Sequence, residues 1–542
     1  MKKLSSVTVS ATALLLGVFA ASSVCSRSQF AFAQDAAASN QLPANTLPSP
    51  TATPAREAPS IQSNAQAELD RDDLLIRFTR EGACIEDIQL KGFKETHGGS
   101  ENAHVTGGHF NCRALALKVG SQDLRTVPAD VKTEGSGSVT LTQKTGQLEV
   151  SKILRLAGQY SGELVIQIKN TGSSAWTGPI AIDLGGVSEL KGAGSLFGSH
   201  PVAFHEASYF FQDKVKRQAL QFEDAPKAES LLEQKNFSPD WVASNSLYFA
   251  LALMPKGNDV FDFTVFRTGF NSAKNSRTPP DRTLYEVWLT TQITDVPPGG
   301  TRSITFDVFA GPKSKSALSA FSGRNLQKNI DYGFFSIIAW PLFYFLAWCE
   351  GVLKNWGLAI IVLTIALKIL LYPLTEKAFV AGKKMQKIQP ELNALKEKFK
   401  DDKQAQQREM MALMAQRGVN PMSGCLPILP QLPIFFGLNA VLTHTFELRH
   451  AHFAGWLNDL TARDPLYITP ALMAVLMYAQ QKLTPAPTSM DPAQQKMMQF
   501  MPLIFAVFML TYPSGLVLYI ITNTVLSLLQ QQYMTRKHKV AE

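Results

Sequence analysis

The chain has 542 residues, of which 45% are hydrophobic and 18% charged, with a formal net charge of +8. This length excludes a single compact domain. The average composition combines a soluble half, up to about residue 330, with an apolar half beyond it. The net positive charge would be compatible with nucleic-acid binding. The basic residues cluster beside apolar runs, however, so attraction to anionic lipid explains their positions better. Five scattered cysteines without a CxxC pair or a Cys/His cluster predict neither a disulfide scaffold nor a metal site.

Residues 1–34 are typical of an export signal. Lys2 and Lys3 precede a long apolar run, and small residues end the segment. The pattern fits both cleavage and retention as a membrane anchor, and either outcome delivers the following region outside the cytoplasm. Residues 35–67 consist mainly of Ala, Ser, Pro, Gln and Thr, so we expect a disordered linker with too few apolar side chains to form a core.

Residues 68–330 contain short β-rich runs such as ELVIQIKN and SITFDVFAG, which Gly, Asn and Pro turns separate. Runs of this kind at short intervals predict one large antiparallel sandwich. The region has no GxSxG nucleophile motif, and no GxxxxGK loop occurs anywhere, so we predict no catalytic residue. Cys84 and Cys112 are candidates for a disulfide if this domain is extracytoplasmic.

Two apolar stretches follow the sandwich. The stretch at 357–374 is long enough to cross a bilayer. The charge-free run within 331–356 could also be counted as a span, but it is crowded with aromatic residues and holds Pro341. The sandwich is exported and the lysine-rich segment after Leu374 should be cytoplasmic, so an odd number of crossings separates them. We therefore predict that 357–374 spans the membrane and that 331–356 is an amphipathic helix in the outer interface.

A single charge, Lys368, interrupts the predicted span. An ammonium at this depth costs ~2.5–3.5 kcal/mol, so such a residue normally faces a hydrated cavity or a partner. Thr364 precedes it by four residues and lies on the same helical face. We predict that this face is the wall of a polar groove inside the membrane. Snorkelling of the lysine to the headgroups is the alternative.

Residues 375–419 are predicted to form a basic cytoplasmic hairpin of two helices, because apolar residues recur at helical spacing in KKMQKIQPELNALKEKF and REMMALMAQR. The methionines offer a soft surface to varied apolar segments, although a seam between two helices is the more common role of such a stripe. The candidates for recruiting incoming chains are Lys383, Lys384, Lys387, Met410 and Met411.

Residues 420–535 hold the remaining four predicted transmembrane helices, and 536–542 form a basic cytoplasmic tail. Prolines around Gln431 predict a kinked helix that presents a buried amide. The turn signal YPSG divides the last apolar run into two spans, roughly 498–510 and 516–533. The second span presents polar groups at membrane depth, namely Tyr519, Thr522, Asn523 and Ser527.

Several long stretches occur in an order that is typical of one family. They are DYGFFSIIAWPL, VNPMSGCLPILPQLPIFFGL, FELRHAHFAGWLNDL and FMPLIFAVFMLTYPSGLVLYIITNTV, with weaker matches in SPDWVASNSLYFALAL and FAGPKSKSAL. They resemble the YidC/Oxa/Alb membrane protein insertases, in the Gram-negative form with a large periplasmic domain. The resemblance implies a multi-pass α-helical protein of the bacterial inner (cytoplasmic) membrane, with a five-helix insertase core and a large all-β periplasmic supersandwich.

The resemblance also implies a groove that opens to the cytoplasm and to lipid, with a basic side chain as its central charge. Many relatives have Arg at the position of Lys368, and Lys keeps the charge but loses the forked donor geometry. The predicted groove residues are Lys368, Thr364, Gln431, Thr522, Asn523 and Tyr519. An incoming apolar helix is expected to slide into lipid along Phe435, Met501 and Phe505.

The sequence therefore predicts a non-enzymatic insertase and folding chaperone, which acts alone or with a Sec-type translocon. Its expected partners are nascent membrane proteins, ribosomes or targeting factors, and anionic lipid, without a cofactor, a small-molecule substrate or direct nucleic-acid binding. A small-molecule transporter or channel is one alternative, but it predicts paired intramembrane charges or inverted repeats, and the sequence has one isolated charge and no internal repeat. A membrane-anchored sugar-binding protein, with its function in the sandwich, is the other.

Overall fold

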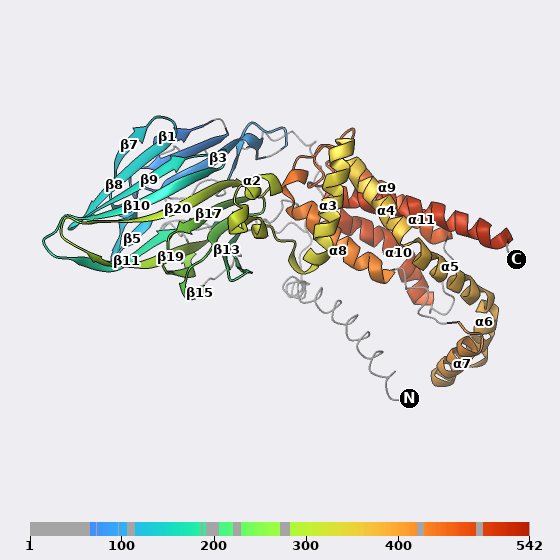
Figure 1. Cartoon of the computed structure of the whole chain (residues 1–542). Coiled ribbons are helices and arrows are strands. Elements are labelled where there is room, and N and C mark those ends of the chain that lie inside the picture. Colours follow the sequence, from blue (N-terminus) through green and yellow to red (C-terminus); the bar gives the residue numbers. More distant parts are fainter. Residues whose placement is uncertain are drawn as a thin grey trace, which may run out of the picture. The chain divides into compact units, whose positions relative to one another are not determined.

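The computed structural model describes residues 65–540, with gaps at 72, 96, 106–113, 186–187, 191–204, 221–228, 271–281, 420–427 and 484–491. The predicted signal at 1–34 and most of the predicted linker at 35–67 lie outside the described residues. The described residues belong to one compact unit. Its first half is built from strands and its second half from helices (Figure 1).

Strands occupy the chain from Ala65 to Pro312, so the predicted start of the β domain at residue 68 is three residues late. The strands are β1 (Ala65–Asp70), β2 (Leu74–Thr79), β3 (Ile85–Lys94), β4 (Asn102–His104), β5 (Leu117–Val119), β6 (Gln122–Asp123), β7 (Asp130–Glu134), β8 (Ser138–Thr145), β9 (Leu148–Leu156), β10 (Ser161–Asn170), β11 (Trp176–Asp183), β12 (Ser188–Leu190), β13 (His205–Phe211), β14 (Lys214–Ala219), β15 (Glu229–Phe237), β16 (Trp241–Ser246), β17 (Phe249–Lys256), β18 (Phe261–Phe270), β19 (Arg282–Val296) and β20 (Thr301–Pro312).

The strands form three sheets with antiparallel pairing (Figure 1). One sheet holds β1 to β4 in chain order, and a second has the order β14-β13-β16-β17-β20-β10-β9-β8-β7. The third has the order β15-β18-β19-β11-β5-β6, and β12 pairs with β19. One hydrophobic core joins all three sheets, with Leu69 on β1, Ile166 on β10 and Val287 on β19 among its members. The predicted all-β sandwich is therefore confirmed.

The hydrophobic alternation that predicted strands also sets which side chains enter this core. Along β9 the side chains of Leu148, Val150 and Leu154 are buried, and the residues between them are more exposed, apart from Lys152, which occupies a core position. Leu154 pairs directly with Leu164 on β10. A residue period of two places one apolar face of each strand against the next sheet, as the sandwich requires.

Helices follow the last strand. The α-helices are α2 (Lys315–Ser319), α3 (Ser336–Leu353), α4 (Trp356–Leu370), α5 (Tyr372–Lys387), α6 (Gln389–Lys398), α7 (Lys403–Gln416), α8 (Ile428–His444), α9 (Ile468–Leu483), α10 (Pro492–Met509) and α11 (Ser514–Val540). The short 3-10 helices are η1 (Leu124–Thr126), η2 (Ser322–Arg324), η3 (Leu326–Asn329), η4 (Gly333–Phe335) and η6 (Phe446–Leu448). The break between α10 and α11 lies at the predicted turn, but α11 continues through most of the predicted tail at 536–542.

The span predicted at 357–374 is too long, because α4 ends at Leu370 and α5 begins at Tyr372 with a bend of 60°. Pro373 explains the break. It has no backbone N–H to continue a helix, and it disfavours helical geometry in the preceding residue, whereas the first turn of a new helix accepts it. Lys368 therefore lies in the last turn of α4 instead of the middle of a longer helix.

Helix α3 packs one face against α4 and α8 and exposes the other. Ala339, Leu342 and Leu346 are buried in the helical core, whereas Ile337 is 88% exposed. By length and composition, Gly333–Leu353 is the one helix of the described residues that is able to cross a membrane alone. The bent pair α4 and α5 passes the same test as a unit. The interfacial placement of 331–356 remains a prediction.

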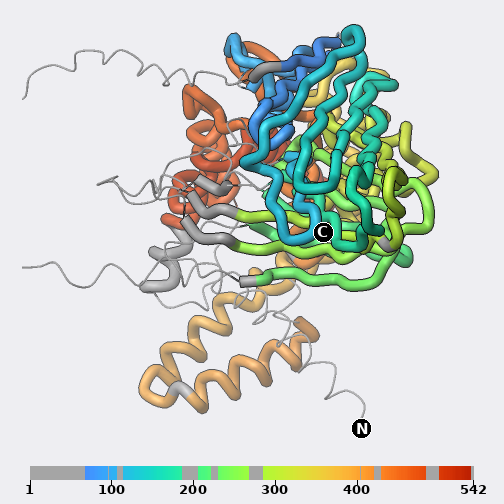
Figure 2. Tube along the Cα trace, turned by 90° about the vertical axis from the view of Figure 1, so that its left-hand side faces the viewer, coloured from blue at the N-terminus to red at the C-terminus, as the bar shows by residue number. Residues whose placement is uncertain are grey.

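Helices α6 and α7 form the predicted hairpin and lie side by side (Figure 2). Their seam contains Ile388, Leu392 and Val419, with Met410 and Met414 packed against them. The interpretation of the methionine stripe as a helical seam is therefore confirmed for Met410. The Arg417 Nη2 atom donates to both carboxylate oxygens of Glu391, at 2.8 and 3.0 Å, and so joins the residue after α7 to the start of α6.

The segment between α8 and α9 joins the β region to the helices. Phe446 packs against the rings of Phe93 and Phe249, with centroid distances of 4.9 and 5.7 Å. The Arg449 guanidinium donates to the Glu95 carbonyl oxygen at 2.7 Å and lies over the Phe249 ring. This segment and the sandwich therefore lie on the same side of the helical core.

Candidate functional site

Lys368 meets a polar partner where α4 contacts α11. Its Nζ donates to the Ser527 hydroxyl oxygen at 2.7 Å. The Ser527 hydroxyl donates in turn to the Asn523 carbonyl oxygen at 2.7 Å, which leaves its oxygen free to accept from the ammonium. The lysine side chain is half-buried. Within the described part of the chain, no carboxylate oxygen lies within 4.0 Å of this ammonium.

Ser527 was not among the predicted groove residues, although it was noted as a polar group at membrane depth. Tyr519, Asn523 and Ser527 recur at intervals of four residues and so share one face of α11. This spacing is the sequence signal that identifies the face. It does not reveal which residue on α4 faces it, because that depends on the relative register of the two helices.

A second polar contact joins α8 to α11. The Gln431 amide donates to the Tyr519 hydroxyl. Tyr519 is buried and Gln431 is half-buried, so the predicted polar amide on α8 has a partner on the same helix that bears Ser527. The structure thus brings two predicted groove residues, Gln431 and Tyr519, into contact, whereas Lys368 bonds to Ser527, and both contacts are made to α11.

The two predicted groove threonines bond within their own helices. The Thr364 hydroxyl donates to the Ile360 carbonyl oxygen at 2.7 Å, and the Thr522 hydroxyl donates to the Leu518 carbonyl oxygen at 2.8 Å. This is the usual way in which a hydroxyl is satisfied within an apolar helix. Thr364 is 1% exposed, whereas Thr522 is half-buried.

The predicted slide residues come from two helices. Phe435 on α8 and Phe505 on α10 pack partly against the helical core, whereas Met501 on α10 is 48% exposed. Helix α10 also exposes other large apolar side chains, namely Phe500, Leu503, Ile504, Val507 and Phe508. An exposed apolar surface of this kind suits contact with lipid or with another apolar helix.

The predicted recruitment residues of the hairpin differ in exposure. Lys384 and Lys387 are exposed, whereas Lys383 is half-buried with its ammonium 5.9 Å from the Phe379 ring centroid. Met411 is 67% exposed, and Met410 lies in the seam described above. Of the two methionines, Met411 is therefore the more exposed.

An ion pair joins the end of α11 to the start of α5. The Lys537 ammonium donates to Glu376 at 2.6 Å, and His538 lies 3.5 Å from the same carboxylate oxygen. The hydrogen bond from Lys537 lowers the pKa of Glu376. The basic end of α11 therefore lies beside the start of α5, the helix that precedes the hairpin.

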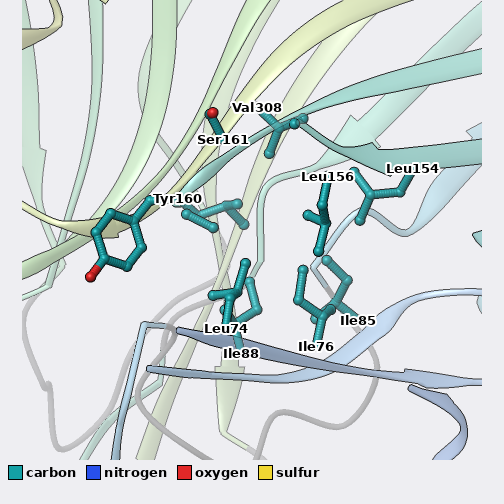
Figure 3. A pocket seen from close by; sticks show the side chains of 12 residues that line it. Leu74, Ile76, Ile85, Ile88, Leu154, Leu156, Tyr160, Ser161 and Val308 are labelled. Carbon is teal, nitrogen blue, oxygen red and sulfur yellow. The ribbon is translucent and has the colours of Figure 1, made fainter. Parts of the chain in front are cut away.

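The β region contains a buried disulfide-bonded cysteine, Cys84. Its predicted partner, Cys112, lies outside the described residues, so the pairing remains a prediction. Figure 3 shows an apolar cavity between the first sheet and the second, with Leu74, Ile88 and Leu154 in its wall. Its volume of about 10 Å³ holds one water molecule at most and leaves no room for a sugar.

Comparison with known proteins gives the family. The model described as 60Kd inner membrane protein matches residues 348–541, and the YidC periplasmic domain matches 66–345. The membrane protein insertase YidC of Geobacter sulfurreducens is 34% identical over 480 residues, which are 86% of this chain and 85% of that protein. The membrane protein insertase YidC of Haemophilus influenzae is 40% identical over 312 residues, which are 56% of this chain and 55% of that protein. The solved structure of YidC from Thermotoga maritima is 15% identical, with a TM-score of 0.32 over 86% of this chain and 98% of that chain.

Both halves of the chain match, in the same order, the two parts of one protein family, and the curated relatives carry one name. These matches favour the insertase over the transporter and the sugar-binding alternatives. The chain belongs to the YidC family of membrane protein insertases.

Proposed function

We propose that this insertase attracts the hydrophilic flanks of newly made membrane proteins into the bacterial inner membrane with the positive charge of Lys368. The obstacle to insertion is that the charges of such a flank are costly within the bilayer. The observation that carries the proposal is the contact of Lys368 with a neutral hydroxyl, Ser527, without a carboxylate nearby in the described residues. A cation whose charge is not neutralised attracts acidic side chains strongly in a medium of low dielectric constant.

The surface of α10 supports the second step. Once the polar flank occupies the groove, the apolar helix of the substrate passes along Phe435, Phe505 and the exposed Met501 into lipid. Burial of apolar surface in the bilayer drives this step, at about 25 cal/mol per Å². No nucleotide hydrolysis is needed, because the substrate supplies the free energy by its own partitioning.

The contacts at the two ends of α4 and α11 support an orientation of the chain across the membrane. Helices α4 and α11 both begin beside the α8–α9 segment, which contacts the β region. The opposite end of α11 contacts the start of α5, where Lys537 pairs with Glu376, and α5 leads into the basic hairpin. The positive-inside tendency places that basic end in the cytoplasm and the sandwich in the periplasm. The exposed Lys384, Lys387 and Met411 then receive chains from ribosomes or targeting factors, with or without a Sec-type translocon.

Charge reversal at Lys368 tests the proposal. In proteoliposomes that contain the purified protein, Lys368→Glu should reduce the insertion of a substrate with an acidic periplasmic tail at least ~10-fold, which corresponds to about 1.4 kcal/mol. Lys368→Arg keeps the charge and should retain most of the activity. A substrate with a neutral tail should depend less on the charge. Equal insertion of the acidic substrate by wild type and Lys368→Glu would refute the role of the cation.

A further inference from the structure

We infer that residues 451–462, here named the register loop, fix the axial register of α4 and α11 and so align Lys368 with Ser527. The inference rests on the proposed function, because it concerns the alignment of the two groove walls. The register loop lies between α8 and α9, and the starts of both helices bond to it. Asn355 and Ser514 are the positioning residues.

At the start of α4, one side chain both caps the helix and ties it to the register loop. The Asn355 Oδ1 atom accepts from the Leu358 backbone N–H at 3.0 Å, which is a standard N-cap bond. Its Nδ2 atom donates to the Phe453 carbonyl oxygen at 2.9 Å. The cap is therefore also an anchor, and α4 has no freedom to slide along its axis without breaking one of the two bonds.

At the start of α11, carbonyl oxygens of the register loop accept hydrogen bonds from the first turn. The backbone N–H of Ser514 donates to Ala462 at 2.7 Å, and that of Gly515 donates to Leu460 at 3.0 Å. The Ser514 hydroxyl donates to the Asp459 carbonyl oxygen at 2.9 Å. The first N–H groups of a helix have no partner within the helix, so these bonds hold α11 by groups that would otherwise need water.

A glycine near each helix start permits this close approach. A Cβ atom at Gly357 would lie 2.0 Å from the Phe453 ring. A Cβ atom at Gly515 would lie 3.0 Å from the Leu460 carbonyl oxygen. A larger residue at Gly357 would therefore require the Phe453 side chain to move, and one at Gly515 would require a small shift of the Leu460 backbone. Both helices thus rest on the same short segment at the same end.

The two anchor points have the same spacing from the paired residues. Lys368 follows Asn355 by 13 residues (355 to 368), and Ser527 follows Ser514 by 13 residues (514 to 527). Both helices run away from the register loop, so a rise of 1.5 Å per residue places both side chains roughly 20 Å from it. This common depth explains how Nζ of Lys368 and Oγ of Ser527 meet at 2.7 Å. A slip of one residue would turn either side chain away by about 100°.

The variant Asn355→Asp separates the anchor from the cap. A carboxylate still accepts from Leu358, but it has no N–H to donate to Phe453. The control is Asn458→Asp, the same change within the register loop, at an exposed side chain whose hydrogen bond is to His452. Asn355→Ala removes both hydrogen bonds. The difference between Asn355→Ala and Asn355→Asp therefore measures the effect of losing the N-cap bond.

The register is read by cysteine crosslinking of the full chain in membranes. A cysteine at position 368 is paired with one at 523, 527 or 531, which lie on one face of α11 and one turn apart. In the otherwise unchanged chain the 527 pair should crosslink fastest. Asn355→Asp should lower the ratio of the 527 product to the neighbouring products at least threefold, and Asn458→Asp should leave it unchanged.

An unchanged ratio in Asn355→Asp, or an equal change in Asn458→Asp, would overturn the inference. This result is independent of the proposed function, because crosslinking needs no substrate. If the ratio is unchanged while Lys368→Glu still blocks insertion, the register inference fails and the role of the cation stands. If the ratio falls while Lys368→Glu inserts normally, the register loop aligns the helices but the cation has no part in insertion.

Discussion

Lys152 shows how much one side chain depends on its surroundings. It lies on β9 at a core position and is 3% exposed. Its ammonium donates to the carbonyl oxygens of Ala83 and Leu115, two residues whose backbones are left-handed, with φ of 48° and 60°. It has no carboxylate partner among the described residues. Burial lowers the pKa of Lys152 to about 7.

This burial predicts a stability that rises with pH. The unfolded chain holds the Lys152 proton up to a pKa of about 10.5, whereas the folded chain releases it near 7. Between these values the unfolded state binds more protons, so the free energy of unfolding should rise by roughly 1.4 kcal/mol per pH unit. Denaturation of the full chain in detergent between pH 7 and 9 measures the slope. Lys152→Met should remove this part of the slope, and identical slopes in both proteins would contradict the assignment.

The sequence predicts the unusual environment of the half-buried Lys368 and misses that of the buried Lys152. Lys368 stands out because a charge in an apolar run is rare and costly, so its environment follows from hydropathy. Lys152 lies in the strand LEVSKILRL, where it is the one polar residue at a core position. From the sequence alone, such a residue is interpreted as an ordinary surface lysine. Only the approach of the turns at Ala83 and Leu115 provides its hydrogen-bond acceptors.

At the scale of the element, the hairpin of α6 and α7 has a small core of its own. Leu392 is 4% exposed in its seam, and Met411 is 67% exposed on its outer face. A hairpin with so few buried side chains depends strongly on each of them, since local stability follows the number of buried apolar contacts. The partly exposed Lys537–Glu376 pair lies at the start of α5, outside this core, and adds little.

Leu392→Ala should therefore loosen the hairpin, with a loss of about 2–3 kcal/mol from its local stability. Amide hydrogen exchange of residues 388–419 in the full chain measures the change. Met411→Ala is the matched control, because its side chain is outside the seam. It should leave exchange unchanged but weaken the binding of ribosomes or targeting factors. Equal exchange rates in the two variants would contradict the conclusion that Leu392 stabilises the hairpin through the seam.

The break between α4 and α5 is also an element-scale result. The apolar run continues through LLYPL, so hydropathy alone extends the span to residue 374. The chain turns at Leu371, where Pro373 is favoured in the first turn of the new helix and disfavoured in a helix interior. Proline in the sequence marks where a break is allowed, but the 60° angle depends on the packing of both helices.

At the scale of the whole molecule, the β region and the helices are connected through Phe446 and Arg449. The Phe446 ring enters the edge of the sandwich core beside Phe93 and Phe249. Glu447 accepts from the Lys315 backbone N–H at 2.9 Å at the start of α2. These contacts precede the register loop in the chain, so the sandwich supports the segment on which α4 and α11 rest.

Phe446→Ala should loosen this joint, at a cost of roughly 2–4 kcal/mol for the lost aromatic contacts. Limited proteolysis of the full chain should then cleave faster near residues 313–331 and 445–450. His452→Ala, an exposed side chain a few residues further on, should leave the cleavage rate unchanged. Equal rates for wild type and Phe446→Ala would show that the joint does not depend on this ring.

The sequence by itself determined the two halves of the protein, the sandwich, the helical hairpin, the break before α11 and the cation at Lys368. These features depend on local patterns, namely a period of two in strands, a period of 3.6 in helices, turn residues and the cost of charge in an apolar run. Each such pattern depends only on residues within one short stretch of the chain.

Only the tertiary structure decided that Ser527 accepts a hydrogen bond from the Lys368 ammonium, that Gln431 meets Tyr519, and that Met410 is partly buried in the seam while Met411 is exposed. The reason is physical. A hydrophobic period fixes which face of an element is buried, but the partner across a contact depends on the axial register and rotation of two elements. Those are set by distant segments such as the register loop, whose hydrogen bonds leave no periodic signal in the sequence.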